Sequence, residues 1–98
     1  MKTRVNVSPQ VEAFVKSLAP EPRRKLTQAI KGLADNRGDI KGLEGKLAGY
    51  SRLRVSGHRV LFQETFKSGT RTINCAFAEK RSIVYDLFIQ LTAEELGQ

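Results

Sequence analysis

Three arginines, Arg52, Arg54 and Arg59, are spaced through an apolar run in the segment YSRLRVSGHRVLFQ. Guanidinium groups stay charged at physiological pH and bind phosphate oxygens through two parallel hydrogen bonds. If Ser56 and Gly57 form a two-residue hairpin turn, Arg54 lies opposite Arg59 and all three arginines share one face. Like charges directly opposite each other destabilise a sheet by up to about 1 kcal/mol. The pattern therefore favours an external anion as the partner of this face.

Internal ion pairs are the alternative, and Glu64, Glu79 and Asp86 are the candidate partners. The segment from Lys46 to Tyr85, however, has eight lysine and arginine residues and only two acidic residues. The whole chain has a formal net charge of +7, which is typical of proteins that bind nucleic acid, an acidic protein or a membrane surface. We interpret the arginine cluster as a site for the phosphate backbone of RNA.

Composition limits the class of protein. A chain of 98 residues with 40% hydrophobic content fits a single domain that spans residues 1–98. One cysteine and one histidine allow no internal disulfide and no Cys/His metal site, so we expect a reducing, cytoplasmic location and no bound metal or cofactor. No apolar run approaches the roughly 20 residues that span a bilayer, and the first residues resemble no signal peptide. We expect no membrane association.

The spacing of apolar residues predicts the order of the elements. A short strand over 3–7 precedes two amphipathic helices that begin at Pro9 and near Pro20. The glycine-rich segment 38–49 is expected to be a loop. Three strands over 50–55, 58–64 and 71–78 follow, with a turn at 67–70 between the last two. A short C-terminal helix is indicated by the helical spacing of Val84, Leu87, Phe88 and Leu91.

These elements predict an α+β fold with the order β-α-α-β-β-β and a short C-terminal helix. The N-terminal strand and helical hairpin pack on a small, twisted, mainly antiparallel sheet, whose other face is open to a ligand. His58 is expected to point inward, towards the helices. Alternation along the last strand places Ile73, Cys75 and Phe77 on one face, so Cys75 is interpreted as a core residue rather than a nucleophile.

Several short motifs resemble the RelE/ParE superfamily of bacterial toxins, and the likeness covers nearly the entire chain. The motifs are Leu43-Glu44-Gly45, Tyr50, Arg52-Leu53-Arg54-Val55, Gly57, His58-Arg59-Val60-Leu61-Phe62 and Arg81-Ser82-Ile83-Val84-Tyr85. The resemblance implies the toxin of a type II toxin-antitoxin pair, held inactive by a cognate antitoxin. RelE members cut mRNA in the ribosomal A site, whereas ParE members poison DNA gyrase and are not nucleases.

On the RelE route, the ribose 2′-hydroxyl attacks the adjacent phosphate without a metal. The protein must supply a base, an acid and cations for the charge that builds on the phosphate. The resemblance implies catalytic roles for Arg52, Arg54, Arg59, Arg81 and Tyr85. We add Lys46 and Lys80 as contacts to RNA phosphates.

The role of Tyr85 has three interpretations. It acts as a base, because neighbouring cations favour the phenolate; it stacks on a nucleobase; or its ring packs in the core beside Phe88. RelE has lysines where Arg52 and Arg54 stand, and arginine is a poorer proton shuttle. Either proton transfer then passes to Tyr85, Lys80 or Lys46, or the activity is weak. We expect a ribosome-dependent mRNA endonuclease, with a ParE-like gyrase inhibitor or a non-toxic nucleic-acid adaptor as the alternatives.

Overall fold

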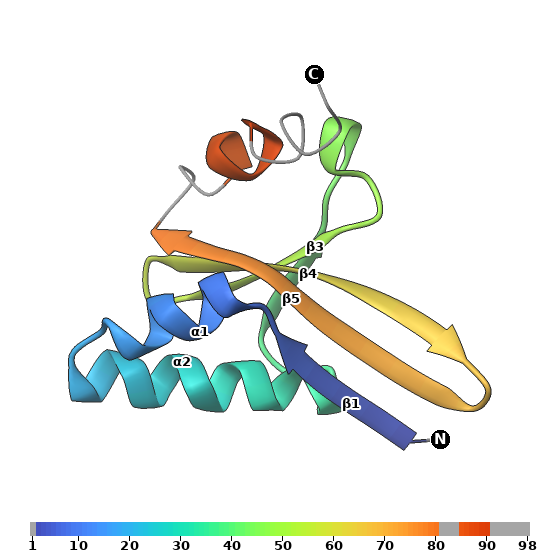
Figure 1. The fold of residues 1–98 in the computed structure, drawn as a ribbon, viewed down its shortest axis with the longest axis horizontal. Helices are drawn as coiled ribbons and strands as arrows, with labels where there is room; N and C mark the ends of the chain where they lie inside the picture. The colour runs from blue at the N-terminus through green and yellow to red at the C-terminus, as the bar shows by residue number, and fades with distance from the viewer. Residues whose placement is uncertain (1, 81–84, 91–98) are drawn as a thin grey trace.

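The structure of the protein is a computed structural model, which describes residues 2–80 and 85–90 (Figure 1). Its five strands form one mixed sheet in the order β1-β5-β4-β3-β2. The elements are β1 (Lys2–Val7), α1 (Pro9–Lys16), α2 (Pro20–Gly32), η1 (Leu33–Asp35), β2 (Asp39–Gly42), η2 (Gly45–Leu47), β3 (Ser51–Val55), β4 (His58–Lys67) and β5 (Thr70–Lys80). Residues 85–90 are helical. The predicted α+β class, with a helical hairpin on one face of the sheet, is confirmed.

The first helix is tied to the sheet by the side chains at its start. Ser8 caps α1, because its Oγ accepts a hydrogen bond from the Val11 amide at 3.2 Å and donates one to the Ala76 carbonyl at 2.8 Å. Gln10 lies two residues further on and exchanges two hydrogen bonds with the backbone of Ala78, at 2.7 and 2.8 Å. Strand β1 ends opposite Cys75. Beyond that point, the side chains of Ser8 and Gln10 form hydrogen bonds with backbone groups of β5 that β1 no longer reaches.

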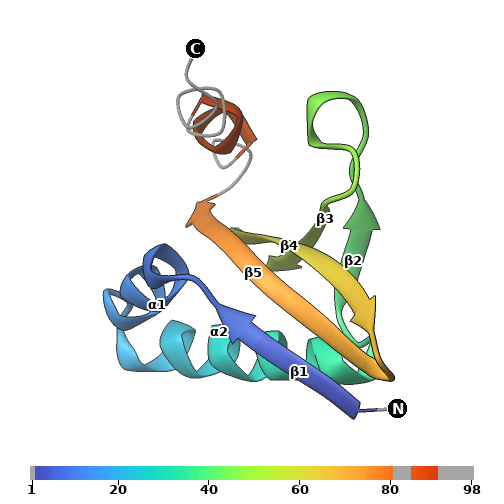
Figure 2. The same cartoon turned by 45° about the vertical axis from the view of Figure 1, so that its right-hand side comes forward.

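Two apolar clusters lie on opposite faces of the sheet. The larger one fills the space between the sheet and helices α1 and α2, and its buried members are Val11, Leu26, Ile30, Leu33, Leu53, Val60, Phe62, Ile73, Cys75 and Ala78. The smaller one, on the outer face, is formed by Leu47, Leu61, Phe77 and Phe88. In both views, the helical segment 85–90 and the segment after β2 lie on the side of the sheet away from α1 and α2 (Figure 2). The outer face is therefore partly covered, and the prediction of a wholly open face is wrong.

The predicted register of the arginine hairpin is confirmed: Val55 pairs with His58 and Arg54 with Arg59. The loop prediction for 38–49 is wrong at Asp39–Gly42, which forms β2 and pairs antiparallel with β3. All residues of β2 are exposed, so no apolar alternation identified this strand in the sequence. It is an edge strand that is held by backbone pairing to β3 rather than by burial.

The prediction that Phe77 shares a face with Ile73 and Cys75 is also wrong. The register between β4 and β5 shifts at Leu61/Phe62: Leu61 pairs with Phe77, but Phe62 pairs with Cys75. The extra residue in β5 reverses the alternation beyond that point. Phe77 consequently lies in the outer cluster, whereas Cys75 lies in the core under the helices.

Candidate anion-binding site

A row of four charged residues crosses the outer face of the sheet. Asp39 on β2 pairs with Arg54 on β3, Arg54 pairs with Arg59 on β4, and Arg59 pairs with Glu79 on β5. Directly paired residues point to the same face, so two arginines lie between two acids. Arg52, two residues before Arg54 on β3, belongs to the same face. The structure thus brings Arg52, Arg54 and Arg59 together, as predicted.

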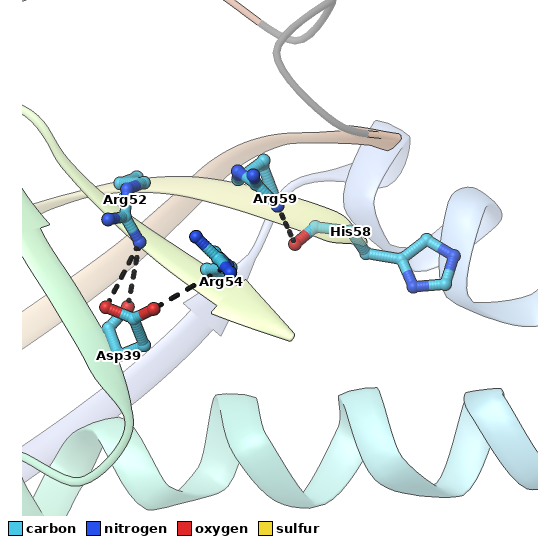
Figure 3. A network of polar contacts seen from close by, with 5 residues as sticks. All are labelled: Asp39, Arg52, Arg54, His58 and Arg59. Atoms are coloured by element: carbon cyan, nitrogen blue, oxygen red, sulfur yellow. Dashed lines mark hydrogen bonds and ion pairs between the residues drawn. The ribbon is translucent and has the colours of Figure 1, made fainter. Parts of the chain in front are cut away.

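Arg52 is the most restrained of the three arginines. Its Nη1 lies 3.3 Å from Asp39 Oδ1 and also 3.3 Å from the Asp39 carbonyl oxygen. Its side chain is only 14% exposed. Figure 3 shows both contacts converging on Asp39. Arg52 therefore joins β3 to the edge strand β2, and its guanidinium group is largely occupied by contacts within the protein.

Arg54 and Arg59 keep most of their binding capacity. The Arg54 Nε lies 3.7 Å from Asp39 Oδ2, and the Arg54 side chain is 56% exposed. Arg59 has no ion-pair partner among the residues that the structure describes; its Nη1 donates a hydrogen bond to the His58 carbonyl at 3.4 Å (Figure 3). One carboxylate therefore serves two arginines, and the third arginine has none.

The charge surplus of this region is smaller than the sequence indicated. Arg71, which we counted among the free cations, is buried on the helical face with its Nε 2.8 Å from Glu64 Oε2. Asp39 lies outside the segment used for the charge count, and it supplies a second internal anion. Internal pairing therefore satisfies Arg71 and Arg52, partly satisfies Arg54, and leaves Arg59.

Tyr85 lies on the outer face, half-buried against the cluster that contains Leu61 and Phe77. Leu61 follows Arg59 by two residues on β4, and Phe77 precedes Glu79 by two residues on β5, so both lie on the face of the charged row. Tyr85 and the arginines therefore occupy the same face. A cavity of about 270 Å³ is lined by Leu43, Glu44, Lys46, Leu47, Tyr85 and Ile89. Lys46 and Tyr85 therefore line the same cavity, and Tyr85 packs against the apolar cluster that includes Phe88.

The remaining predicted residues lie elsewhere. Lys80 pairs with His58 rather than with a member of the charged row, which directs it to the helical face at the end of β5. His58 itself points inward, as predicted, with its ring 5.6 Å from that of Phe14 in an edge-on contact. Arg81 lies outside the described residues.

Asp39 is the member of this charged row whose contact with Arg52 and Arg54 the sequence did not predict. Its only signal was indirect: a strand after the second helix, antiparallel to β3, would bring an acid at position 39 opposite Arg54. The loop prediction for this segment removed that possibility.

The described part of the chain offers little for other chemistries. No three His, Cys, Asp or Glu side chains within it gather to hold a metal ion, and none of its helices is long and apolar enough to cross a bilayer. Burial raises the pKa of the Cys75 thiol to about 11, so the thiolate that a nucleophile requires is disfavoured.

Comparison with solved structures shows what fold surrounds this site. The YoeB/ParE toxin from Agrobacterium tumefaciens matches with a TM-score of 0.64 and 17% identity, over 83% of this chain and 99% of that one. The RelBE2 toxin-antitoxin complex from Mycobacterium tuberculosis gives the same TM-score and identity, over 83% of this chain and 100% of the other. The archaeal RelE-RelB complex from Pyrococcus horikoshii OT3 matches with a TM-score of 0.63 and 23% identity, over 84% and 98%.

The chain has the fold of the RelE/ParE toxins. No protein-family model and no curated protein matches its sequence. The fold agrees with the resemblance seen in the short motifs, and at 17–23% identity it is the architecture that is shared. Within this RelE/ParE fold, the arginines of β3 and β4 occupy the face opposite the helical hairpin.

Proposed function

We propose that the protein is the toxin of a type II toxin-antitoxin pair and that it acts in the cytoplasm as a ribosome-dependent mRNA endonuclease. The observation that carries this proposal is the placement of Arg52, Arg54, Arg59 and Tyr85 on one face, with a single carboxylate within ion-pair distance of the three arginines among the described residues. The RelE/ParE fold supports the toxin class.

The chemistry would divide between these residues. Arg54 and Arg59 clamp the scissile phosphate and stabilise the charge that builds on its oxygens. The 2′-hydroxyl attacks that phosphate, and the bond to the 5′ oxygen breaks. Tyr85 takes the proton of the hydroxyl or stacks on a base, and Lys46 beside it supplies a cation or a proton for the leaving oxygen. Arg52 holds the edge of the site rather than the substrate, because Asp39 engages it.

A ParE-like gyrase inhibitor is the second candidate. It is favoured by the state of the arginines, since Asp39 already lies within ion-pair distance of Arg52 and Arg54, and by the packing of Tyr85 against apolar side chains. A toxin that only binds needs neither an acid nor a base at this face. The two candidates share the fold and differ in turnover.

Arg59→Ala tests the nuclease directly. We expect mRNA cleavage in a translating ribosome reaction, mapped by primer extension, to fall about 100-fold, because the variant loses the arginine that has no ion-pair partner among the described residues. Arg4→Ala is the matched control, since it removes an equal charge from an exposed residue of β1. Both variants should unfold at the wild-type denaturant concentration.

Cleavage by Arg59→Ala at the wild-type rate would remove the nuclease proposal. A parallel gel assay for gyrase-linked DNA breaks separates the second candidate. If the wild-type protein arrests growth and traps gyrase on DNA without cutting mRNA, the inhibitor is the correct assignment.

The cognate antitoxin is proposed to bind on the helical side. A groove of about 390 Å³ there is lined by Val5, Val7, Val11, Glu12, Val15, Lys16, Arg23, Thr27, Ile30 and Lys31. Its floor is apolar and three of its charged residues are basic; Val7 is 42% exposed. Such a groove fits the apolar face of an amphipathic helix whose polar face is acidic.

Val7→Glu should weaken antitoxin binding more than about tenfold, because it places a negative charge in the apolar floor. Asn6→Glu is the matched control: it adds the same charge to the next residue of β1, on the opposite face. Titration calorimetry with the protein encoded next to this one measures both. Equal affinities for the two variants, or affinity that ignores ionic strength, would contradict this placement.

A further inference from the structure

Asp39 occupies a position in the arginine cluster that an external anion would otherwise take. Its two carboxylate oxygens divide between two arginines: Oδ1 lies 3.3 Å from Arg52 Nη1, and Oδ2 lies 3.7 Å from Arg54 Nε. A phosphate binds guanidinium groups through two oxygens in the same way. Figure 3 shows the carboxylate between the two side chains.

The two contacts differ in strength. Arg52 is 14% exposed and also donates a hydrogen bond to the Asp39 backbone carbonyl, so this contact survives without the carboxylate charge. Arg54 is 56% exposed and is reached only by Oδ2, at a distance too long for a hydrogen bond. The carboxylate therefore shields Arg54 electrostatically without engaging its fork.

No other described carboxylate does this. Glu79, at the far end of the same row, pairs with Arg59 in the strand register but lies beyond ion-pair distance of it; its Oε1 accepts a hydrogen bond from the Lys80 amide at 3.2 Å. The cluster is thus shielded from the β2 side and left free on the β4 side.

We propose that Asp39 is an affinity-determining residue of the anion site: its carboxylate takes the phosphate position at Arg54, so that a nucleic-acid strand engages Arg59 fully and Arg54 incompletely. The inference rests on the proposed function in placing phosphates at these arginines. It requires no turnover, because it concerns binding alone. Removing the carboxylate charge opens one further phosphate contact.

Asp39→Asn provides the test, because the amide keeps the shape of the side chain and the backbone carbonyl that binds Arg52. The probe is a fluorescein-labelled ten-nucleotide oligouridylate, titrated by anisotropy over a range of salt concentrations. We expect roughly twofold to fivefold tighter binding, the range that exposed ion pairs contribute. The plot of log K against log salt should become steeper by about 0.7, the increment for one more phosphate on a single strand.

Asp35→Asn is the matched control, since it removes the same charge from an exposed residue of η1 that forms no ion pair with an arginine in the described structure. This control should leave the salt slope unchanged. A second arm repeats both substitutions in the Arg54→Ala background. There the gain from Asp39→Asn should disappear, because the arginine that it releases is gone.

Equal effects of the two substitutions, a persistent gain in the Arg54→Ala background, or weaker binding by Asp39→Asn would each overturn the proposal. Failure of both the wild-type protein and Asp39→Asn to bind the oligonucleotide would overturn it as well. The ribosome assay tests the nuclease proposal separately. A negative result there would not change the outcome of the binding test.

Discussion

Arg71 and Arg54 lie on opposite faces of the same sheet, and each is next to one carboxylate. Arg71 binds Glu64 at 2.8 Å, the Asn36 side chain at 2.7 Å and the Ala34 carbonyl at 3.3 Å, with 11% of its side chain exposed. Among the described residues, Arg54 has one ion-pair contact, at 3.7 Å, and its side chain is 56% exposed. The same residue type is fully coordinated on one face and nearly free on the other.

This difference separates an arginine that is coordinated within the protein from one that is exposed and incompletely paired. Arg71 binds Ala34 in η1 and Asn36, which follows η1 in a left-handed conformation with φ of 57°, so these contacts hold η1 against the β4–β5 hairpin. A buried guanidinium needs such partners, because an unpaired one costs several kcal/mol. The exposed arginines of the outer face carry no such requirement, so their incomplete pairing is available for a ligand.

Of the substitutions on the two faces, Arg71→Ala should have the largest effect on the stability of the protein. We expect a loss of about 3 kcal/mol in the free energy of unfolding, because Glu64 and the acceptors around it lose their common donor. Arg54→Ala is the matched control on the other face, and it should change stability by less than about 0.5 kcal/mol. Urea denaturation followed by circular dichroism measures both.

Equal losses in the two variants would mean that the outer-face arginine is as structural as Arg71. That result would also remove the basis for treating the outer face as a binding site.

The parts of the fold that were predictable depend on local signals. The hairpin register followed from Ser56-Gly57, because a two-residue turn fixes every pair along the strands beside it. The start of α1 followed from Ser8 and Pro9, which supply a cap and a first-turn residue. These signals lie within a few residues of the structure that they determine.

The errors depend on tertiary contacts. Strand β2 is exposed throughout and forms only because β3 offers a free edge, so its sequence carries no period. The register shift in β5 reverses the side of Phe77, and no glycine or proline marks it. For the site, the shared face of the three arginines was predictable from the hairpin. The Asp39 contact required β2, and the burial of Arg71 required its contact with η1.

Cys75 gives a smaller test of the contrast between the closed helical face and the open outer face. It lies in the core under the helices, and burial raises the pKa of its thiol from 9.0 to about 11. Between these values the thiol ionises in the unfolded chain but stays protonated in the folded one, so the folded state loses stability as pH rises. This contribution should lower the free energy of unfolding by about 1 kcal/mol from pH 8 to pH 10.

Other groups also titrate in this range, so the informative quantity is the difference in pH dependence between the wild-type protein and Cys75→Ala. The variant should lack the Cys75 contribution and otherwise behave as the wild-type protein, and urea denaturation at several pH values measures the difference. Parallel curves would show that water reaches the thiol in the folded state. The core under the helices would then not exclude water, and the contrast between a closed helical face and an open outer face would be wrong for the helical face.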